Sequence, residues 1–270
     1  MLRQSAFLTG FPTLLSGRAK RSAQERLRQE REHLHQKGLG EISAIFADEI
    51  PPELLARHAD TDRTRVYSQE VTFWAFFEQV LSEDGSCAQS VARVQQWHAQ
   101  ADLPAPSANT ASYVEARQRL PSSMLQSIHH ALFTALSTRI CSADLWRGHR
   151  VKAIDATSVQ MPDTAFNQQA YPQPSGQSPG CGFPVVQLVG LIDLIHGGLE
   201  NFVESPIAVS ELRGFDLLLP YVAENEVLVG DRAYSSYEAI ARLHGGGAHF
   251  VGRVHQSRRI DFRKPEPGAR

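Results

Sequence analysis

Residues 151–164 read VKAIDATSVQMPDT, and the first part of this stretch has the pattern of a short buried strand that leads directly to Asp155. The pattern recurs downstream, where residues 226–231 read EVLVGD and a β-branched apolar run ends in Asp231. Open α/β sheets gather their functional groups at the carboxyl ends of the strands. We therefore expect the two aspartates to meet at one site, provided that their strands are neighbours in one sheet.

An aspartate that follows a strand also has a simpler explanation. Aspartate is a common turn former and a common helix N-cap. A helix-like segment, residues 236–244, follows Asp231 at a short distance. The strand pattern alone therefore leaves open whether Asp155 and Asp231 bind a ligand.

Longer strings around the two aspartates are more specific. They read DATSVQMPDTAFNQQAYPQPSGQSPGCGFPVVQL from Asp155, GDRAYSSYEAI from Gly230 and FVGRVHQSRRIDFRK from Phe250. The N-terminal half contributes VTFWAFFEQVLSEDGSCAQSVARVQQW and PSANTASYVEARQRLP. Over about residues 40–265, the chain resembles the DDE-type transposases of bacterial insertion sequences, which move DNA by cut-and-paste.

The resemblance implies an α/β protein with an N-terminal all-helical domain and an incomplete ribonuclease-H-like mixed-sheet domain. It implies that Asp155 bridges two Mg²⁺ (or Mn²⁺) ions and that Asp231 holds one of them. Two such ions stabilise the entering and leaving oxygens when a phosphodiester is cleaved. Mg²⁺ prefers oxygen ligands and keeps several waters, which suits a small set of carboxylates and a substrate phosphate.

Members of this family carry a third acid, a glutamate on a later helix, in a motif that also contains a tyrosine, an arginine and a lysine. Only HQSRRIDFRKPEPGAR follows Val254, and it does not resemble that motif. We therefore expect a chain truncated at its C-terminus. Glu204 and Glu238 are candidate substitutes, although Glu204 ends a predicted hairpin strand and Glu238 has the simpler role of an acid in the first turn of a helix.

Three functions remain open. The first is a DNA transposase that binds insertion-sequence ends as a homodimer and catalyses Mg²⁺-dependent cleavage and transfer into target DNA. The second is a non-catalytic DNA-binding inhibitor or assembly partner of a full-length transposase. The third is a different metal-dependent nuclease or phosphatase. A full-length reading frame at the same locus separates the first two.

Charge is distributed unevenly along the chain. The net charge is −2, but residues 1–37 carry eight Lys or Arg against three Glu, and residues 253–270 carry six against two acids. Basic ends around an acidic centre suit phosphate contacts at two places. The alternative is a pair of solvated tails.

Four arginines are candidate DNA contacts. Arg232 follows the second aspartate directly, and Arg253 ends the last predicted strand. Arg117 and Arg119 lie on the second helix of a helix-turn-helix-like unit over residues 86–120. Ion pairs and ordinary helix packing are the competing explanations.

The spacing of apolar residues predicts three regions: a basic arm (1–39), a helical DNA-binding or assembly domain (40–147) and a sheet domain (148–270). The elements expected in the sheet domain are strands at 151–154, 185–193, 199–204, 226–231 and 248–254 and helices at 211–221 and 236–244, with an irregular loop at 168–182. In the helical domain we expect helices at 62–81, 86–100 and 111–120 and from 121 onward, with Phe73, Trp74, Phe76 and Phe77 in the core.

Composition narrows the cellular setting. The chain has 42% apolar and 21% charged residues, which is ordinary for a globular protein. Three cysteines without metal-site spacing favour free thiols in a reducing compartment. The most apolar run, residues 185–195, is too short to span a bilayer. We therefore expect a cytoplasmic protein that joins the nucleoid when it is bound to DNA.

Overall fold

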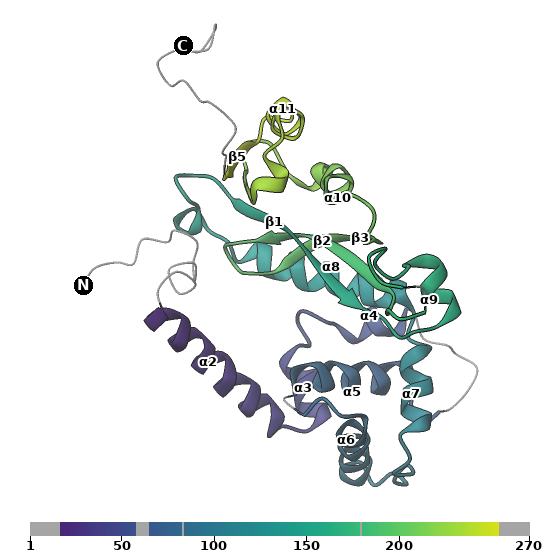
Figure 1. Ribbon diagram of the computed structural model, residues 1–270. Coiled ribbons are helices and arrows are strands. Elements are labelled where there is room, and N and C mark those ends of the chain that lie inside the picture. The colour runs from purple at the N-terminus through teal and green to yellow at the C-terminus, as the bar shows by residue number, and fades with distance from the viewer. Residues whose placement is uncertain (1–16, 58–64, 83, 179, 254–270) are drawn as a thin grey trace, which may run out of the picture. The chain divides into compact units, whose positions relative to one another are not determined.

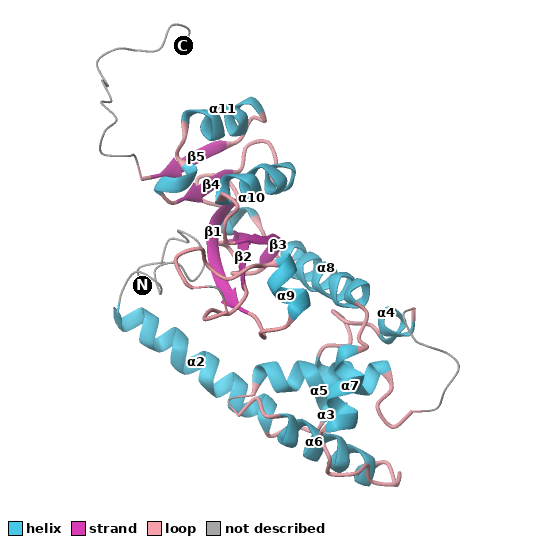
Figure 2. Ribbon diagram, turned by 45° about the vertical axis from the view of Figure 1, so that its right-hand side comes forward, coloured by secondary structure: helices cyan, strands magenta, loops and turns pink. Residues whose placement is uncertain are grey.

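The structure is a computed structural model that describes residues 17–57, 65–82, 84–178 and 180–253. These residues fall into two compact units that divide between Arg139 and Ile140. Figure 2 shows the first unit as helical and the second as built on a β-sheet. Most of the predicted basic C-terminal segment and the first 16 residues of the predicted arm lie outside the described residues.

The helical unit begins with a long helix and continues with shorter ones. Its elements are α2 (Gly17–His35), α3 (Leu39–Ile45), α4 (Pro52–Ala56), α5 (Gln69–Leu81), α6 (Cys87–Gln100), α7 (Ala111–Gln118) and α8 (Ser122–Thr138). The hydroxyls of Ser68 and Ser86 accept the backbone N–H groups of Val71 and Gln89, at 3.2 Å each. These caps fix where α5 and α6 begin.

Residues 65–68, which the prediction placed in a helix over residues 62–81, precede the Ser68-capped start of α5 and are not helical, and residues 62–64 lie outside the described residues. The aromatic run packs as predicted: Phe73 and Trp74 are buried, and their rings meet edge to face at 5.0 Å. Val80 is 63% exposed, although its neighbour Gln79 is buried. The two residues thus lie on different sides of the last turn of α5.

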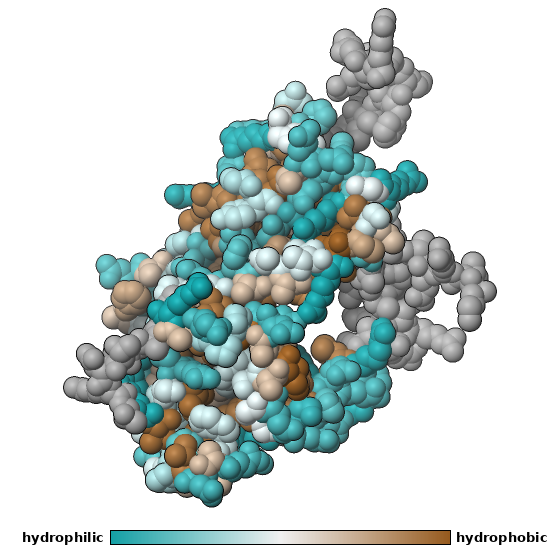
Figure 3. All heavy atoms as spheres, turned by 180° about the vertical axis from the view of Figure 1, so that it is seen from behind, coloured by the Kyte–Doolittle hydropathy of each residue, from teal (hydrophilic) through white to brown (hydrophobic). Residues whose placement is uncertain are grey.

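The described side chains of helix α2, from Glu25 to Leu34, include only two apolar ones, Leu27 and Leu34. The described side chains from Glu25 to Gln29 are exposed, including the apolar Leu27. Arg28 bridges Glu25 and Glu32, three and four residues away, on the helix surface. Figure 3 shows this helix as a mainly hydrophilic rod. Such i,i+3 and i,i+4 pairs support a solvated helix only weakly.

The second unit holds a mixed sheet of five strands, with two helices in its crossovers (Figure 1). Its elements are η1 (Ser142–Asp144), β1 (Val151–Gln160), α9 (Ala165–Ala170), β2 (Val185–Asp193), β3 (Leu199–Pro206), α10 (Glu211–Leu218), η2 (Leu219–Tyr221), β4 (Val227–Gly230), η3 (Arg232–Tyr234), α11 (Tyr237–Gly245) and β5 (His249–Gly252). The strand order is β3-β2-β1-β4-β5. Strand β2 pairs antiparallel with β1 and with β3, whereas β4 pairs parallel with β1 and β5 pairs parallel with β4. This is a ribonuclease-H-like α/β fold, as predicted.

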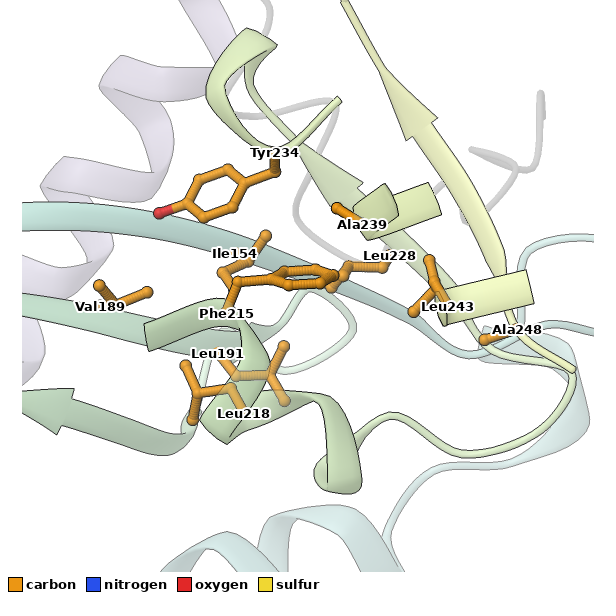
Figure 4. Packing of buried hydrophobic residues seen from close by; sticks show 10 residues of the cluster. All are labelled: Ile154, Val189, Leu191, Phe215, Leu218, Leu228, Tyr234, Ala239, Leu243 and Ala248. Atoms are coloured by element: carbon orange, nitrogen blue, oxygen red, sulfur yellow. The ribbon is translucent and has the colours of Figure 1, made fainter. Parts of the chain in front are cut away.

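Helices α10 and α11 supply the two crossovers that the parallel pairs need, and both contribute to one apolar cluster over the sheet (Figure 4). Phe215 and Leu218 of α10 and Leu243 of α11 pack there with Leu228 of β4. Gly214 lets α10 approach β2 closely, because a Cβ at that position would stand 2.6 Å from Cγ2 of Val189. The sheet and its crossover helices are thus held by close packing.

Buried charges lie at the start of β1, three residues before Asp155. The ammonium group of Lys152 is buried and pairs with Glu200 at 2.8 Å and with Glu226 at 2.7 Å. It also donates a hydrogen bond to the carbonyl of Tyr221 at 2.6 Å. This network joins β1, β3 and the segment before β4, so it supports the sheet rather than a binding site.

Two elements of the sheet unit differ from the prediction. Strand β1 continues to Gln160, five residues beyond Asp155, because β2 pairs with it along that whole length. The predicted irregular loop over residues 168–182 begins inside a short helix, α9, whose Thr164 cap accepts the Asn167 N–H at 3.1 Å. Neither cross-strand pairing nor a single capping turn is visible in local apolar periodicity.

Candidate active site

The register of three parallel strands brings the two aspartates to the same level. Ile154 pairs with Gly230 in the last pair between β1 and β4, and Gly230 pairs with Gly252 between β4 and β5. The next residues along the three strands are Asp155, Asp231 and Arg253. Two acids and one base therefore follow a single row of the sheet, on adjacent strands about 4.8 Å apart.

Both aspartates are exposed, and each is fixed by a short local hydrogen bond. The Ala156 N–H donates to Oδ1 of Asp155 at 2.9 Å, and the Ala233 N–H donates to Oδ1 of Asp231 at 2.7 Å. Asp231 thus caps the 3₁₀ turn η3, which is the structural role that its sequence position also allowed. Within the described part of the chain, neither Oδ2 atom accepts a hydrogen bond, so both remain available as ligands.

Tyr234 closes the site on the side of the apolar cluster. Its side chain is 1% exposed, and its ring packs on that of Phe215 with centroids 6.1 Å apart. Figure 4 shows its hydroxyl pointing away from Ala239 and Leu243. Burial raises the pKa of this hydroxyl well above its ordinary value, and three carboxylates, of Glu211, Asp155 and Asp231, raise it further. The group is therefore a neutral hydrogen-bond donor among acids.

Glu211 begins α10 and is the third of these acids. Its Oε1 accepts a hydrogen bond from Nε2 of the buried Gln187 on β2, at 3.3 Å. The sequence argument missed both Glu211 and Tyr234. The available signals were an acid in the first turn after the third strand and a tyrosine three residues after Asp231.

Comparison with known proteins bears on this arrangement. Residues 146–267 match the family described as the transposase DDE domain. This segment is a transposase DDE domain. The match includes β1 with Asp155 and the β4–η3 junction with Asp231. The resemblance expected from the sequence strings is confirmed at this level.

Two solved structures of transposases are similar to the chain at low identity. One is a piggyBac transposase synaptic complex with hairpin DNA, at 12% identity and a TM-score of 0.33, which aligns with 79% of this chain and 48% of that one. The other is the Mos1 transposase paired-end complex with left transposon end, at 10% and 0.27, with 73% and 61% of the two chains covered. The chain thus spans less than two thirds of the length of either protein. No curated protein sequence matches it.

The donor set in the DDE domain fits a hard divalent cation. Asp155 and Asp231 offer exposed carboxylate oxygens on adjacent strands, and Mg²⁺ and Mn²⁺ take oxygen ligands. Among the described residues, no group of three or more His, Cys, Asp or Glu side chains stands close enough to enclose an ion. The two aspartates by themselves thus offer carboxylate oxygens from only two side chains.

The four candidate arginines have different surroundings. Arg232 and Arg253 are exposed in the DDE domain, beside Asp231 and at the end of β5. Arg119 is exposed at the C-cap of α7, and its Nη1 lies 3.9 Å from Oε2 of Glu115. Arg117 contacts other side chains within the helical unit.

The guanidinium of Arg117 lies over the rings of Phe76 and Tyr113, at 5.6 and 5.9 Å. It also donates to Oε1 of Gln79 at 3.1 Å. These contacts tie α7 to α5 and favour the packing explanation for this residue.

The two glutamates considered as substitute ligands have other neighbours. Glu204 lies on β3 beside Tyr171, whose hydroxyl pKa is raised mainly by burial and further by this carboxylate. Glu238 pairs with Arg242 one turn along α11. None of the helices described here is long and apolar enough to cross a membrane.

Proposed function

We propose that this chain acts as a DNA transposase. It binds the ends of an insertion sequence and catalyses Mg²⁺- or Mn²⁺-dependent phosphodiester cleavage and strand transfer. One observation carries the proposal: within a DDE domain, the register of β1 and β4 sets Asp155 and Asp231 side by side at the ends of their paired segments.

The chain's own groups have separate roles in this chemistry. Asp155 and Asp231 hold divalent ions through their free carboxylate oxygens, with their backbone hydrogen bonds fixing the side chains. When bound, such ions stabilise charge on the entering and leaving oxygens of an in-line displacement at phosphorus. Arg253 follows β5 in the same row of the sheet and contacts DNA phosphate. Arg232 also contacts DNA phosphate. The helical unit provides further DNA-binding or assembly surface.

A cleavage assay tests the proposal directly. The substrate is supercoiled plasmid that carries the genomic sequences flanking the coding region, incubated with the full chain and Mg²⁺ or Mn²⁺. We expect metal-dependent nicking that D155N and D231N each reduce by about a thousandfold, equivalent to about 4 kcal/mol of barrier. The matched control is E224Q, which neutralises an exposed acid in the segment before β4.

A second readout locates the metal without relying on turnover. Fe²⁺ bound in place of Mg²⁺ reduces added hydrogen peroxide to hydroxyl radicals, with ascorbate restoring Fe²⁺, and the radicals cut the polypeptide near the ligands of the ion. We expect cuts close to Asp155 and Asp231 that disappear in D155N and persist in E224Q. Nicking that survives in both aspartate variants, or cuts that lie elsewhere, would refute the assignment.

A further inference from the structure

The face of the sheet that points away from α10 and α11 carries Asp155. Ile154, directly before it in β1, packs into the apolar cluster of Figure 4. Successive side chains of a strand point to opposite faces, so Asp155 points away from that cluster. At the start of β1 this second face is covered, because Trp146 packs there with Val151. At the level of Asp155 the face is open, and the aspartate is exposed.

The row that contains Asp155 continues onto β2 and β3. Asp155 pairs with Gly190, and Gly190 pairs with Phe202. Residues paired in this way share a face, so Phe202 lies on the same face as Asp155, two strand spacings or about 10 Å away. Phe202 is 46% exposed. Leu199, also exposed, covers the glycine between them, with Cδ1 3.0 Å from the position that a Cβ would take.

Basic residues are missing from this side of Asp155. Residues 153–212 contain no lysine or arginine, although they include most of β1 and all of β2 and β3. Glu204 is exposed two residues along β3 from Phe202, and therefore points to the same face. The two arginines that we assign to phosphate contacts follow β4 and β5, on the other side of β1. The surface around Phe202 therefore disfavours phosphate but suits an uncharged, flat group.

Single apolar side chains are common on protein surfaces and need no special explanation. Phe202 and Leu199 differ from such isolated residues because they form one exposed apolar surface in the row of a proposed metal ligand. DNA provides an uncharged aromatic group at a short distance from every phosphate. Only an unpaired base has a face free for a side chain, because the bases of a duplex are stacked on one another.

We propose that Phe202 stacks on an unpaired DNA base close to the phosphate that is cut. The inference rests on the proposed function, because it takes Asp155 and Asp231 as the residues that place this phosphate. The row of the sheet then has two sides. Arginines on the β4 and β5 side contact the backbone, and Phe202 on the β3 side holds a base.

DNA binding by the full chain tests the stacking. The probe is a dye-labelled duplex from the genomic sequence flanking the coding region, with a short 3′ overhang of adenines, and its partner probe has abasic sites in place of those adenines. Fluorescence anisotropy gives the Kd of each. Stacking on an aromatic side chain contributes enough per base that we expect F202A to raise the Kd for the adenine overhang about tenfold. The Kd for the abasic overhang stays within about twofold.

Two substitutions at the same position separate stacking from apolar bulk. F202Y keeps a ring and retains the affinity for the adenine overhang, whereas F202L keeps an apolar side chain and loses most of it. Y237A is the control, because Tyr237 is an aromatic residue at the start of α11 that is 84% exposed. It leaves both Kd values unchanged. Circular dichroism melts report any loss of fold separately from the Kd.

The outcomes distinguish this inference from the proposed function. Equal binding of the two overhangs by wild type, or an equal loss on both in F202A, would overturn the stacking role. An equal loss accompanied by a change from dimer to monomer in sedimentation would assign the surface to a second copy of the chain instead. Plasmid nicking that D155N does not reduce would contradict the proposed function, whereas the stacking role is judged from the two overhangs alone.

Discussion

Replacing Gly214 with alanine tests whether close packing of α10 on β2 holds the DDE domain together. The added Cβ would stand 2.6 Å from Cγ2 and 2.8 Å from Cβ of Val189. Real Cβ contacts are not this short, so either the helix or the strand has to move. Val189 is fully buried in the centre of β2, and its Cβ is fixed to a strand that pairs on both sides.

Two opposing terms set the size of the effect. Overpacking a close contact of this kind costs about 1–3 kcal/mol, and the involvement of a strand Cβ favours the upper end. Alanine gains about 1 kcal/mol over glycine in a helix interior. The expected net loss of stability is about 2 kcal/mol.

The matched control is G245A, because Gly245 ends α11 with nothing within 4 Å of an added Cβ. Amide hydrogen exchange in β2 reports the unfolding free energy of the sheet unit, independently of the helical unit. We expect faster exchange in G214A by about thirtyfold and unchanged or slower exchange in G245A. Unchanged exchange in G214A would refute the argument that a helix–strand contact at this glycine limits the fold.

Three further predictions concern charge. K152M removes the cation that pairs with the buried carboxylates of Glu200 and Glu226. Urea denaturation should therefore show an unfolding free energy lower by about 3–5 kcal/mol, and wild-type stability would contradict the network's role. Burial lowers the pKa of His196; the unfolded chain therefore binds a proton that the folded chain does not, and stability falls as the pH drops below about 6.5. H196Q should flatten this fall, and an unchanged pH profile would exclude the histidine as its source. R253A should reduce the salt slope of DNA binding by about one unit while R253K retains it, and an unchanged slope in R253A would remove the phosphate contact.

The order of elements in the sheet unit was predictable because each element carries a local signal. Apolar runs marked the strands up to β5, and helical spacing marked α10 and α11. The serines that cap α5 and α6 are equally local, although the competing signal of the apolar run in α5 placed its start too early. The row that holds Asp155 and Asp231 followed only when strand order was added to these signals.

The length of β1 and the exposure of Val80 were not predictable, because both depend on partners that are distant in sequence. Strand β1 extends to Gln160 because β2 pairs with it, and Val80 is exposed although its neighbour Gln79 is buried, because the helices that pack on α5 cover only one side of it. Arg117 illustrates the same limit: its sequence suits a phosphate contact, but Gln79 and the rings of Phe76 and Tyr113 engage it within the helical unit.

The sequence by itself determined the strand and helix pattern of the second unit and the identity of two acids at the ends of apolar runs, because these properties reside in neighbouring residues. Tertiary structure alone decided that α10 lies beside β2 and Tyr234, with Glu211 accepting a hydrogen bond from Gln187. That proximity arises from the crossover of α10 over the sheet and from the packing of Phe215 on Tyr234. Contacts of this kind depend on the summed geometry of the whole sheet, which no local pattern encodes.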